Sequence, residues 1–472
     1  MKTKVSSTRL GTIIGRTESG VDRFLGIPFA ANSRFSYAHL SEQIHDEYDA
    51  SIFRGTPLQL KTPWMNDSPE PSEDALYLNI WRKSDSAGKL PVIFWIYGGG
   101  FEGGTASSPM YSGLNFVDQG KAIFVSANYR VGFLGFGYLP NEIPSNIGVS
   151  DIIKALEWVS KNIETFGGDP NNVTVIGQSA GGFIAGALSS IPEAKKYFTR
   201  LVMLSGAASR IVPLGRAEEL TQAWKDDLIN SGYSIQNAPA EAILSSQAKV
   251  ISKDIGIRNA TQPNALGVVL DFPIGLMSGH PFESLTSKDS VDVVIGFTDS
   301  EIASFRRYAG KDFEPKDADS LKQEIASWGI AIDRVKSIFD FYEARSGSDL
   351  GKLRELILTD WIYKLPAIRL AFARRFLNLR TYLFEFSNTD ESPLGHGEDL
   401  KFLFKPLSEL SRTDSEVASN WLSLLLEFAK TGQMNVADMS KGLHFTNLSH
   451  SEDIQWGQLQ SVLDLWQGVE RP

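Results

Sequence analysis

Short apolar runs rich in β-branched and aromatic residues alternate along the chain with longer segments of helical periodicity. Several of these runs are apolar at successive positions, which is typical of central parallel strands covered on both faces. The expected strands span residues 75–81, 90–97, 122–129, 173–177, 200–205, 291–296 and 381–386. Strands that alternate with helices predict an α/β fold, in which helices flank a mostly parallel, mixed central sheet.

Apolar residues recur at helical spacing between residues 149 and 166, and again from about residue 414 to 430. The second of these helices is expected to stop at Gly432, which can adopt the left-handed conformation that ends helices. Residues 207–290 and 306–378 depart from the strand–helix rhythm and are interpreted as helix-rich insertions that follow strands. Because open α/β sheets bind ligands at the ends of their strands, these insertions are expected to border the ligand site.

One segment of the second insertion, residues 367–379, has an apolar face opposite Arg369, Arg374 and Arg375. Such a pattern fits either a helix that binds a membrane surface or a helix with one solvated face. The overall acidity of the chain favours the solvated helix.

Composition narrows the class of protein. The chain shows no internal repeat or low-complexity linker, so we expect a single domain over residues 1–472. A net charge of −10 argues against a nucleic acid partner, and the lack of cysteine excludes disulfides and thiolate chemistry. No run of 18 apolar residues or apolar signal segment occurs, so we expect a soluble, cytoplasmic protein that neither spans nor binds a membrane. The composition leaves the oligomeric state open.

A candidate nucleophile lies in Gly177-Gln178-Ser179-Ala180-Gly181, which fits the pattern G-x-S-x-G. An expected strand precedes it, and a helix of small residues is expected from Ala180 to Leu188. A sharp turn between strand and helix forces the serine into a strained conformation, and only glycine leaves room on either side. The turn would expose the Ser179 hydroxyl above the sheet, where it can attack a carbonyl carbon. The alternative is a glycine-rich packing turn with a solvated serine.

Consecutive glycines follow the expected strand 90–97. Backbone N–H groups in such a loop can converge on one oxygen and stabilise an oxyanion, and we assign Gly99, Gly100 and the N–H of Ala180 to this role. Gly98, Gly100 and Gly103 also satisfy the dinucleotide fingerprint G-x-G-x-x-G. That fingerprint requires a helix to begin at the glycines. No amphipathic pattern follows them, so dinucleotide binding is disfavoured. A loop with only a structural role is the other alternative, and it is also disfavoured.

The base should be a histidine late in the chain, because the order in this arrangement is nucleophile, acid, histidine. His396 is the candidate, since it lies between two glycines in a loop after strand 381–386, whereas His444 and His450 fall in expected surface chain. The acid should follow strand 291–296, where Asp299 and Glu301 are both available. Spacing alone does not choose between these two carboxylates.

These motifs and others spread along nearly the whole chain resemble the type-B carboxylesterase family, which includes the cholinesterases. The matching segments are residues 24–30, 72–81, 97–101, 128–132, 166–170, 177–181, Trp421 and 428–432. The resemblance implies the α/β-hydrolase fold. It also implies a glutamate as acid, five residues after the glycine that ends its strand, which from Gly296 is Glu301. Ala75 replaces a family cysteine, as in cysteine-poor intracellular bacterial members.

The expected activity is hydrolysis of a small-molecule carboxylic ester through an acyl-enzyme on Ser179, with no cofactor and no metal. Cleavage of amides, carbamates or thioesters by the same triad is the first alternative, and a non-catalytic binding protein on the same fold is the second. Candidate pocket residues lie near the motifs, and these are Phe101, Gln178, Phe183, Phe297 and Phe305. Glu73, Arg130 and Asp169 are expected to form a structural set of ion pairs.

The resemblance to cholinesterases raises the question of a cationic substrate. Those enzymes carry a glutamate immediately before the nucleophile, where its charge helps to hold choline, and Gln178 is neutral at that position. A cation site also needs a tryptophan face. Trp64 is the only tryptophan before Trp81, and its loop lacks a disulfide. We therefore expect a preference for neutral esters.

Overall fold

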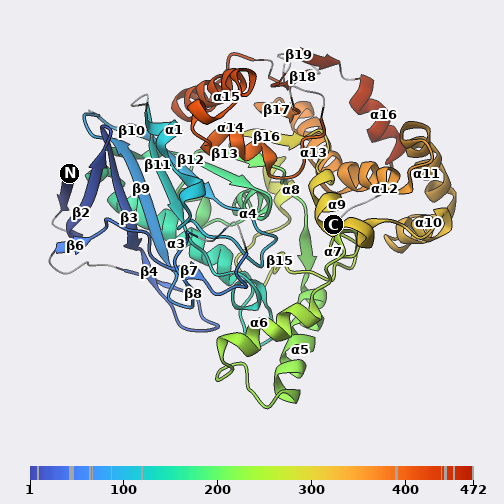
Figure 1. Cartoon of the computed structure of the whole chain (residues 1–472), viewed down its shortest axis with the longest axis horizontal. Helices are drawn as coiled ribbons and strands as arrows, with labels where there is room; N and C mark the ends of the chain where they lie inside the picture. Colours follow the sequence, from blue (N-terminus) through green and yellow to red (C-terminus); the bar gives the residue numbers. More distant parts are fainter. Residues whose placement is uncertain are drawn as a thin grey trace.

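The computed structural model describes residues 1–7, 10–41, 47–62, 65, 67–86, 88–118, 121–388, 392–436, 438–440, 444–449, 452–455 and 457–469. Its main feature is a 13-stranded mixed sheet that draws strands from nearly the whole chain (Figure 1). In sheet order the strands are β1 (Lys2–Ser7), β2 (Gly11–Glu18), β3 (Val21–Pro28), β9 (Tyr77–Lys83), β11 (Ile123–Ala127), β10 (Leu90–Ile96), β12 (Gly168–Gln178), β13 (Arg200–Leu204), β16 (Asp292–Thr298), β17 (Thr381–Phe386), β18 (His444–Asn447) and β19 (Glu452–Gln455). The short strand β6 (Glu47–Asp49) pairs with β2.

The strands from β11 to β18 in this order run parallel, while β1, β2, β3 and β9 at one edge and β19 at the other are antiparallel to their neighbours. The predicted α/β class is confirmed, and each expected strand is present. The antiparallel edge was not predicted, because half-exposed strands such as β2 lack a continuous apolar run. Since the central strands are parallel, the loops after β10, β12, β16 and β17 all leave from the same edge of the sheet.

Helices cover both faces of the sheet. In Figure 1, α15 (Arg412–Thr431) lies above the sheet and α3 (Ile147–Asn162) below it, and both contact β12. The helix α15 ends as expected at Gly432, which adopts a φ of 76°. The remaining helices outside the insertions are α1 (Leu114–Val117), α2 (Phe133–Phe136), α4 (Ala180–Leu188), α14 (Lys401–Phe404) and α16 (Gly457–Leu465).

Both expected insertions lie between neighbouring strands of the sheet. The first, between β13 and β16, contains α5 (Leu214–Asn230), α6 (Ala240–Val250), α7 (Ile255–Arg258), α8 (Pro281–Leu285) and a parallel pair of strands, β14 (Ile211–Pro213) and β15 (Val268–Leu270). The second, between β16 and β17, contains α9 (Ala303–Ala309), α10 (Ala318–Ser327), α11 (Ile332–Ser346), α12 (Leu350–Thr359) and α13 (Leu365–Phe376). Figure 1 shows α5 and α6 projecting together below the sheet.

The expectation of a solvated arginine face on α13 is wrong for Arg374. This side chain is fully buried, and it donates hydrogen bonds to the carbonyl oxygens of Leu285, Val291 and Arg380. A guanidinium has five N–H donors, so it can satisfy several buried carbonyl groups at once. Among the described residues, no helix is long and apolar enough to cross a membrane.

A buried ion pair joins the loop after β11 to α3. Arg130 donates two side-chain hydrogen bonds to Asp151, at 2.7 and 2.8 Å, and the exposed fractions of the two side chains are 5% and 0%. The expectation that Glu73, Arg130 and Asp169 form one set of ion pairs is therefore wrong. Glu73 pairs with Arg34, and the Oδ1 atom of Asp169 accepts the backbone N–H of Asn171. Asp151 lies among the apolar residues of α3, so the spacing of residues in the sequence does not indicate that it pairs with Arg130.

Removing one partner of this pair should be costly, since it leaves the other charge buried without compensation. Asp151→Asn is expected to lower the free energy of unfolding by about 3–5 kcal/mol, measured by chemical denaturation. The matched control is Asp340→Asn, which breaks the exposed pair between Lys336 and Asp340 and should cost less than about 1 kcal/mol. Equal losses in the two variants would contradict a special role for the buried pair.

Candidate active site

Ser179 stands at a sharp turn between β12 and α4. Its φ of 56° and ψ of −123° are unusual for a residue with a side chain, and such a conformation costs on the order of 1–3 kcal/mol. A Cβ atom on Gly177 would lie 2.1 Å from the backbone oxygen of Gly181, and one on Gly181 would lie 2.1 Å from that of Ile96. The strand, helix and β10 therefore approach so closely that only glycine fits on either side of the serine.

A continuous chain of hydrogen bonds leads from Ser179 to a buried carboxylate. The Nε2 atom of His396 lies 2.7 Å from the Ser179 Oγ, and its Nδ1 atom lies 2.6 Å from the Oε2 atom of Glu301. The other oxygen of Glu301 accepts the N–H of Thr298 at 2.9 Å. Glu301 is fully buried, and the exposed fraction of the His396 side chain is 11%. The structure thus brings together the serine, glutamate and histidine that the sequence singled out.

Asp299, the other candidate acid, has a different partner. Its Oδ1 atom accepts the backbone N–H of Leu394 at 3.0 Å, so it fixes the start of the loop that carries His396. Burial raises the pKa of the Asp299 carboxyl to about 6. The carboxylate that reaches the imidazole is therefore that of Glu301, which agrees with the choice that the family resemblance implied.

Two other ionisable groups set the charge around Glu301. Burial, followed by the negative charge of Glu301, raises the pKa of the Asp399 carboxyl to about 7. A carboxyl that is partly protonated at neutral pH repels Glu301 less than a full charge would. Burial disfavours the charged form of Lys364, but Glu385 and other carboxylates outweigh this effect and raise its pKa. Lys364 therefore remains a cation beside these carboxylates.

The glycines after β10 lie beside Ser179. Gly98, Gly99 and Gly100 line a cavity that Ser179 also lines. Gly99 and Gly100 adopt φ angles of 130° and 64°. Within the described chain, neither N–H group donates a hydrogen bond to another residue. Ala180 is the first residue of α4, where a helix offers its N–H no acceptor. No helix begins at these glycines, so the dinucleotide interpretation is excluded.

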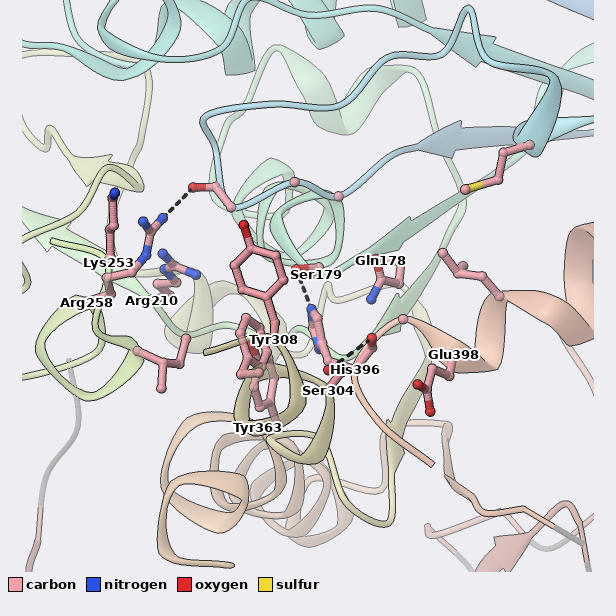
Figure 2. A pocket seen from close by; sticks show the side chains of 18 of the residues that line it. Gln178, Ser179, Arg210, Lys253, Arg258, Ser304, Tyr308, Tyr363, His396 and Glu398 are labelled. Atoms are coloured by element: carbon pink, nitrogen blue, oxygen red, sulfur yellow. Dashed lines mark hydrogen bonds between the residues drawn. The ribbon is translucent and has the colours of Figure 1, made fainter. Parts of the chain in front are cut away.

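Ser179 and His396 line a cavity of about 740 Å³. Figure 2 shows Arg210, Arg258 and Lys253 together on one side of the Ser179–His396 pair. Other lining residues are Gln178 and Glu398 on the opposite side in this view, and Tyr308 and Tyr363. The ring of Tyr363 lies 4.7 Å from that of His396. Among the described residues, no group of three His, Asp or Glu side chains is arranged as metal ligands are.

Two of the five candidate pocket residues line the cavity, and these are Gln178 and Phe305. The assignment of Phe101 and Phe183 to the cavity wall is wrong, because both rings are buried beneath Arg210. The guanidinium of Arg210 lies 5.3 Å from the ring centroid of Phe101 and 6.0 Å from that of Phe183. Phe297 is also core, beneath Lys364. Proximity to a motif in the sequence does not tell which side of the loop a ring occupies.

The cationic side of the cavity was not predicted from the sequence. Arg210 follows β13 at the carboxyl edge of the sheet. Because ligands of α/β sheets bind at strand ends, this position in the sequence could have indicated a residue of the ligand site. Lys253 and Arg258 lie inside the first insertion and carry no local signal. Trp64, which entered the argument about a cation site, lies outside the described residues.

The fold and this site define a serine hydrolase of the α/β class, and comparison with known proteins identifies its family. The model of the Carboxylesterase family matches residues 2–464, so the chain belongs to the carboxylesterase family. It is a serine carboxylesterase, a carboxylic-ester hydrolase with the α/β-hydrolase fold. The alternatives of amide, carbamate or thioester cleavage and of a non-catalytic role are not favoured.

Individual relatives support this assignment. The chain is 31% identical to para-nitrobenzyl esterase of Bacillus subtilis (strain 168), over 92% of this chain and 91% of that protein. It is 26% identical to cholinesterase of Mus musculus, over 88% of this chain and 76% of that protein. A solved structure of PNB esterase, 27% identical, superposes with a TM-score of 0.84 and covers 98% of this chain and 100% of that one. A thermophilic PNB esterase gives the same TM-score at 26% identity, with coverage of 98% and 100%.

The contacts of Asp299 and Glu301 predict different effects when each is neutralised. Glu301→Gln should lower kcat/KM by on the order of 10³–10⁴-fold, because an amide can favour the wrong imidazole tautomer and does not stabilise its cation. Asp299→Asn should lower it less than about tenfold, since the amide oxygen can still accept the N–H of Leu394. Steady-state kinetics with a p-nitrophenyl ester measure both. A larger loss in Asp299→Asn would assign the role to Asp299.

Proposed function

We propose that Ser179, His396 and Glu301 form the catalytic triad of this carboxylesterase. The observation that carries the proposal is the continuous hydrogen-bonded chain from the Ser179 Oγ through both imidazole nitrogens to Glu301. It starts at a strained turn of the kind that places a nucleophile at the carboxyl edge of the sheet. A serine held by a packing turn alone would not require an imidazole at 2.7 Å from its oxygen.

In this mechanism the Ser179 Oγ attacks the carbonyl carbon of an ester while Nε2 of His396 takes its proton. The Nδ1–H group of His396 donates to Glu301, which stabilises the imidazolium that forms. The imidazolium then gives its proton to the leaving alcohol, and an acyl-enzyme remains on Ser179. Water, activated by the same imidazole, attacks the acyl carbon, and Ser179 regains its proton as the carboxylic acid leaves.

The negative oxygen of each tetrahedral intermediate needs donors already in place. We assign these donors to the backbone N–H groups of Gly99, Gly100 and Ala180. Two observations support this assignment. In the described chain the N–H groups of Gly99 and Gly100 donate no hydrogen bond, and both glycines line the cavity. Preorganised donors of this kind contribute on the order of 3 kcal/mol each to the stability of the transition state.

We further propose that the enzyme prefers neutral small-molecule esters to cationic ones. Gln178, next to the nucleophile, is neutral, and Arg210, Arg258 and Lys253 all line the cavity. A cationic choline ester would therefore meet repulsion instead of attraction. We also propose that the protein is cytoplasmic, because a chain of 472 residues without cysteine has no use for an environment that forms disulfides.

Replacement of the nucleophile tests this function. Ser179→Ala should lower kcat for a p-nitrophenyl ester by on the order of 10⁶, because only the oxyanion donors and substrate binding remain. Ser189→Ala is the control: it removes another buried hydroxyl, at the end of the same helix, and should keep activity within about threefold. A Ser179→Ala variant that retains a tenth of the wild-type turnover would overturn the proposal.

A further inference from the structure

Arg210 is a buried cation without an anionic partner. The exposed fraction of the residue is 7%, and among the described residues no carboxylate forms an ion pair with it. Its Nη2 atom is buried and has no hydrogen-bond partner in the described part of the chain. Burial lowers the pKa of the Arg210 guanidinium to about 10, so the group remains charged at neutral pH. Natural proteins rarely leave a buried charge without a partner, and such exceptions concentrate at functional sites.

Arg210 lies between two aromatic rings and the cavity of the candidate active site. The rings of Phe101 and Phe183 lie against the guanidinium, and Arg210 itself lines the cavity that contains Ser179. Stacking on aromatic rings explains how the fold tolerates the cation. Among the described residues, these contacts leave the Nη2 atom without a hydrogen-bond acceptor.

Two more cations lie in the same part of the cavity (Figure 2). Arg258 pairs with Glu102, and its Nη2 atom would lie 3.2 Å from a Cβ atom on Gly100, so it is adjacent to the proposed oxyanion donors. Lys253 is exposed and has no ion-pair partner among the described residues. Glu102 thus balances one of three positive charges, and this side of the cavity keeps a positive surplus.

We propose that Arg210, assisted by Lys253 and Arg258, forms a subsite that binds a carboxylate group carried by the ester substrate. The inference rests on the proposed function, because it names a substrate class for that site. A guanidinium matches a carboxylate through two parallel N–H···O hydrogen bonds, and a desolvated guanidinium makes them strong. The preferred substrates are then monoesters that bear a free carboxylate, on either the acyl part or the alcohol part, ahead of the neutral esters expected from the sequence.

Matched ester pairs that differ in one charge test the subsite. On the acyl side, the mono-p-nitrophenyl ester of adipic acid is compared with the p-nitrophenyl ester of adipic acid monoamide. On the alcohol side, 3-(4-acetoxyphenyl)propanoate is compared with its primary amide. The p-nitrophenyl ester of 6-(trimethylammonio)hexanoic acid adds a cation to the acyl series. The kcat/KM values are measured at low and at physiological ionic strength and corrected for spontaneous hydrolysis.

In the wild-type enzyme, at least one anionic ester should exceed its amide at least tenfold in kcat/KM, and the cationic ester should fall below the amide. Arg210→Gln should lower the favoured anion-to-amide ratio at least fivefold. The control Arg412→Gln removes an equal charge from an arginine that is 94% exposed, and it should change that ratio less than twofold. Lys253→Gln changes only an exposed side chain, and it should lower the ratio at least twofold even if Arg210→Gln fails to fold.

Failure of the subsite is separable from failure of the proposed function. If the amide esters are hydrolysed but neither anionic ester reaches the tenfold preference, the subsite is overturned while the esterase mechanism stands. If Arg210→Gln folds and keeps the wild-type ratio, Arg210 is not the carboxylate's partner. If no ester is hydrolysed by the wild-type enzyme, the proposed function itself fails.

Discussion

The close approach of three backbone segments around Ser179 is the constraint on which the rest of the site depends. β10, β12 and the first turn of α4 pack so tightly that Gly177 and Gly181 have no room for a Cβ atom. This packing holds Ser179 at a positive φ, a conformation that an isolated chain would leave. Because β10 ends beside the same turn, its glycines bring free N–H groups to the side of the hydroxyl. One packing constraint thus positions both the nucleophile and the candidate oxyanion donors.

A second feature is the way in which buried charged groups are compensated in the interior. Glu301 is fully buried, yet it lies beside His396 and near Lys364, so its negative charge has opposite charges or donors on several sides. Asp399 avoids full ionisation instead, since burial raises the pKa of its carboxyl. Arg210 is the exception, because in the described chain it packs against rings, while the nearby carboxylate of Glu102 forms its ion pair with Arg258. In our account, that missing partner comes from the substrate.

The parts of the site that sequence reasoning found are those tied to backbone geometry. The glycines around Ser179, the strand before it and the loop position of His396 each leave a local pattern, and the structure brings these residues together. Side-chain direction leaves no such pattern. The sequence therefore does not reveal that the ring of Phe101 lies beneath Arg210, or that Asp151 is the partner of Arg130. Contacts between distant segments arise from tertiary packing, which neither spacing nor periodicity encodes.

The central claim is that the strained turn makes Ser179 the nucleophile, and covalent capture tests it most directly. The enzyme is treated with one equivalent of diethyl p-nitrophenyl phosphate, and the modified peptide is identified by mass spectrometry while residual activity is followed. The account predicts one diethylphosphoryl group per chain, on Ser179, with loss of esterase activity in proportion to labelling. Labelling of another residue in step with the loss of activity, or full activity in a stoichiometrically labelled enzyme, would contradict it.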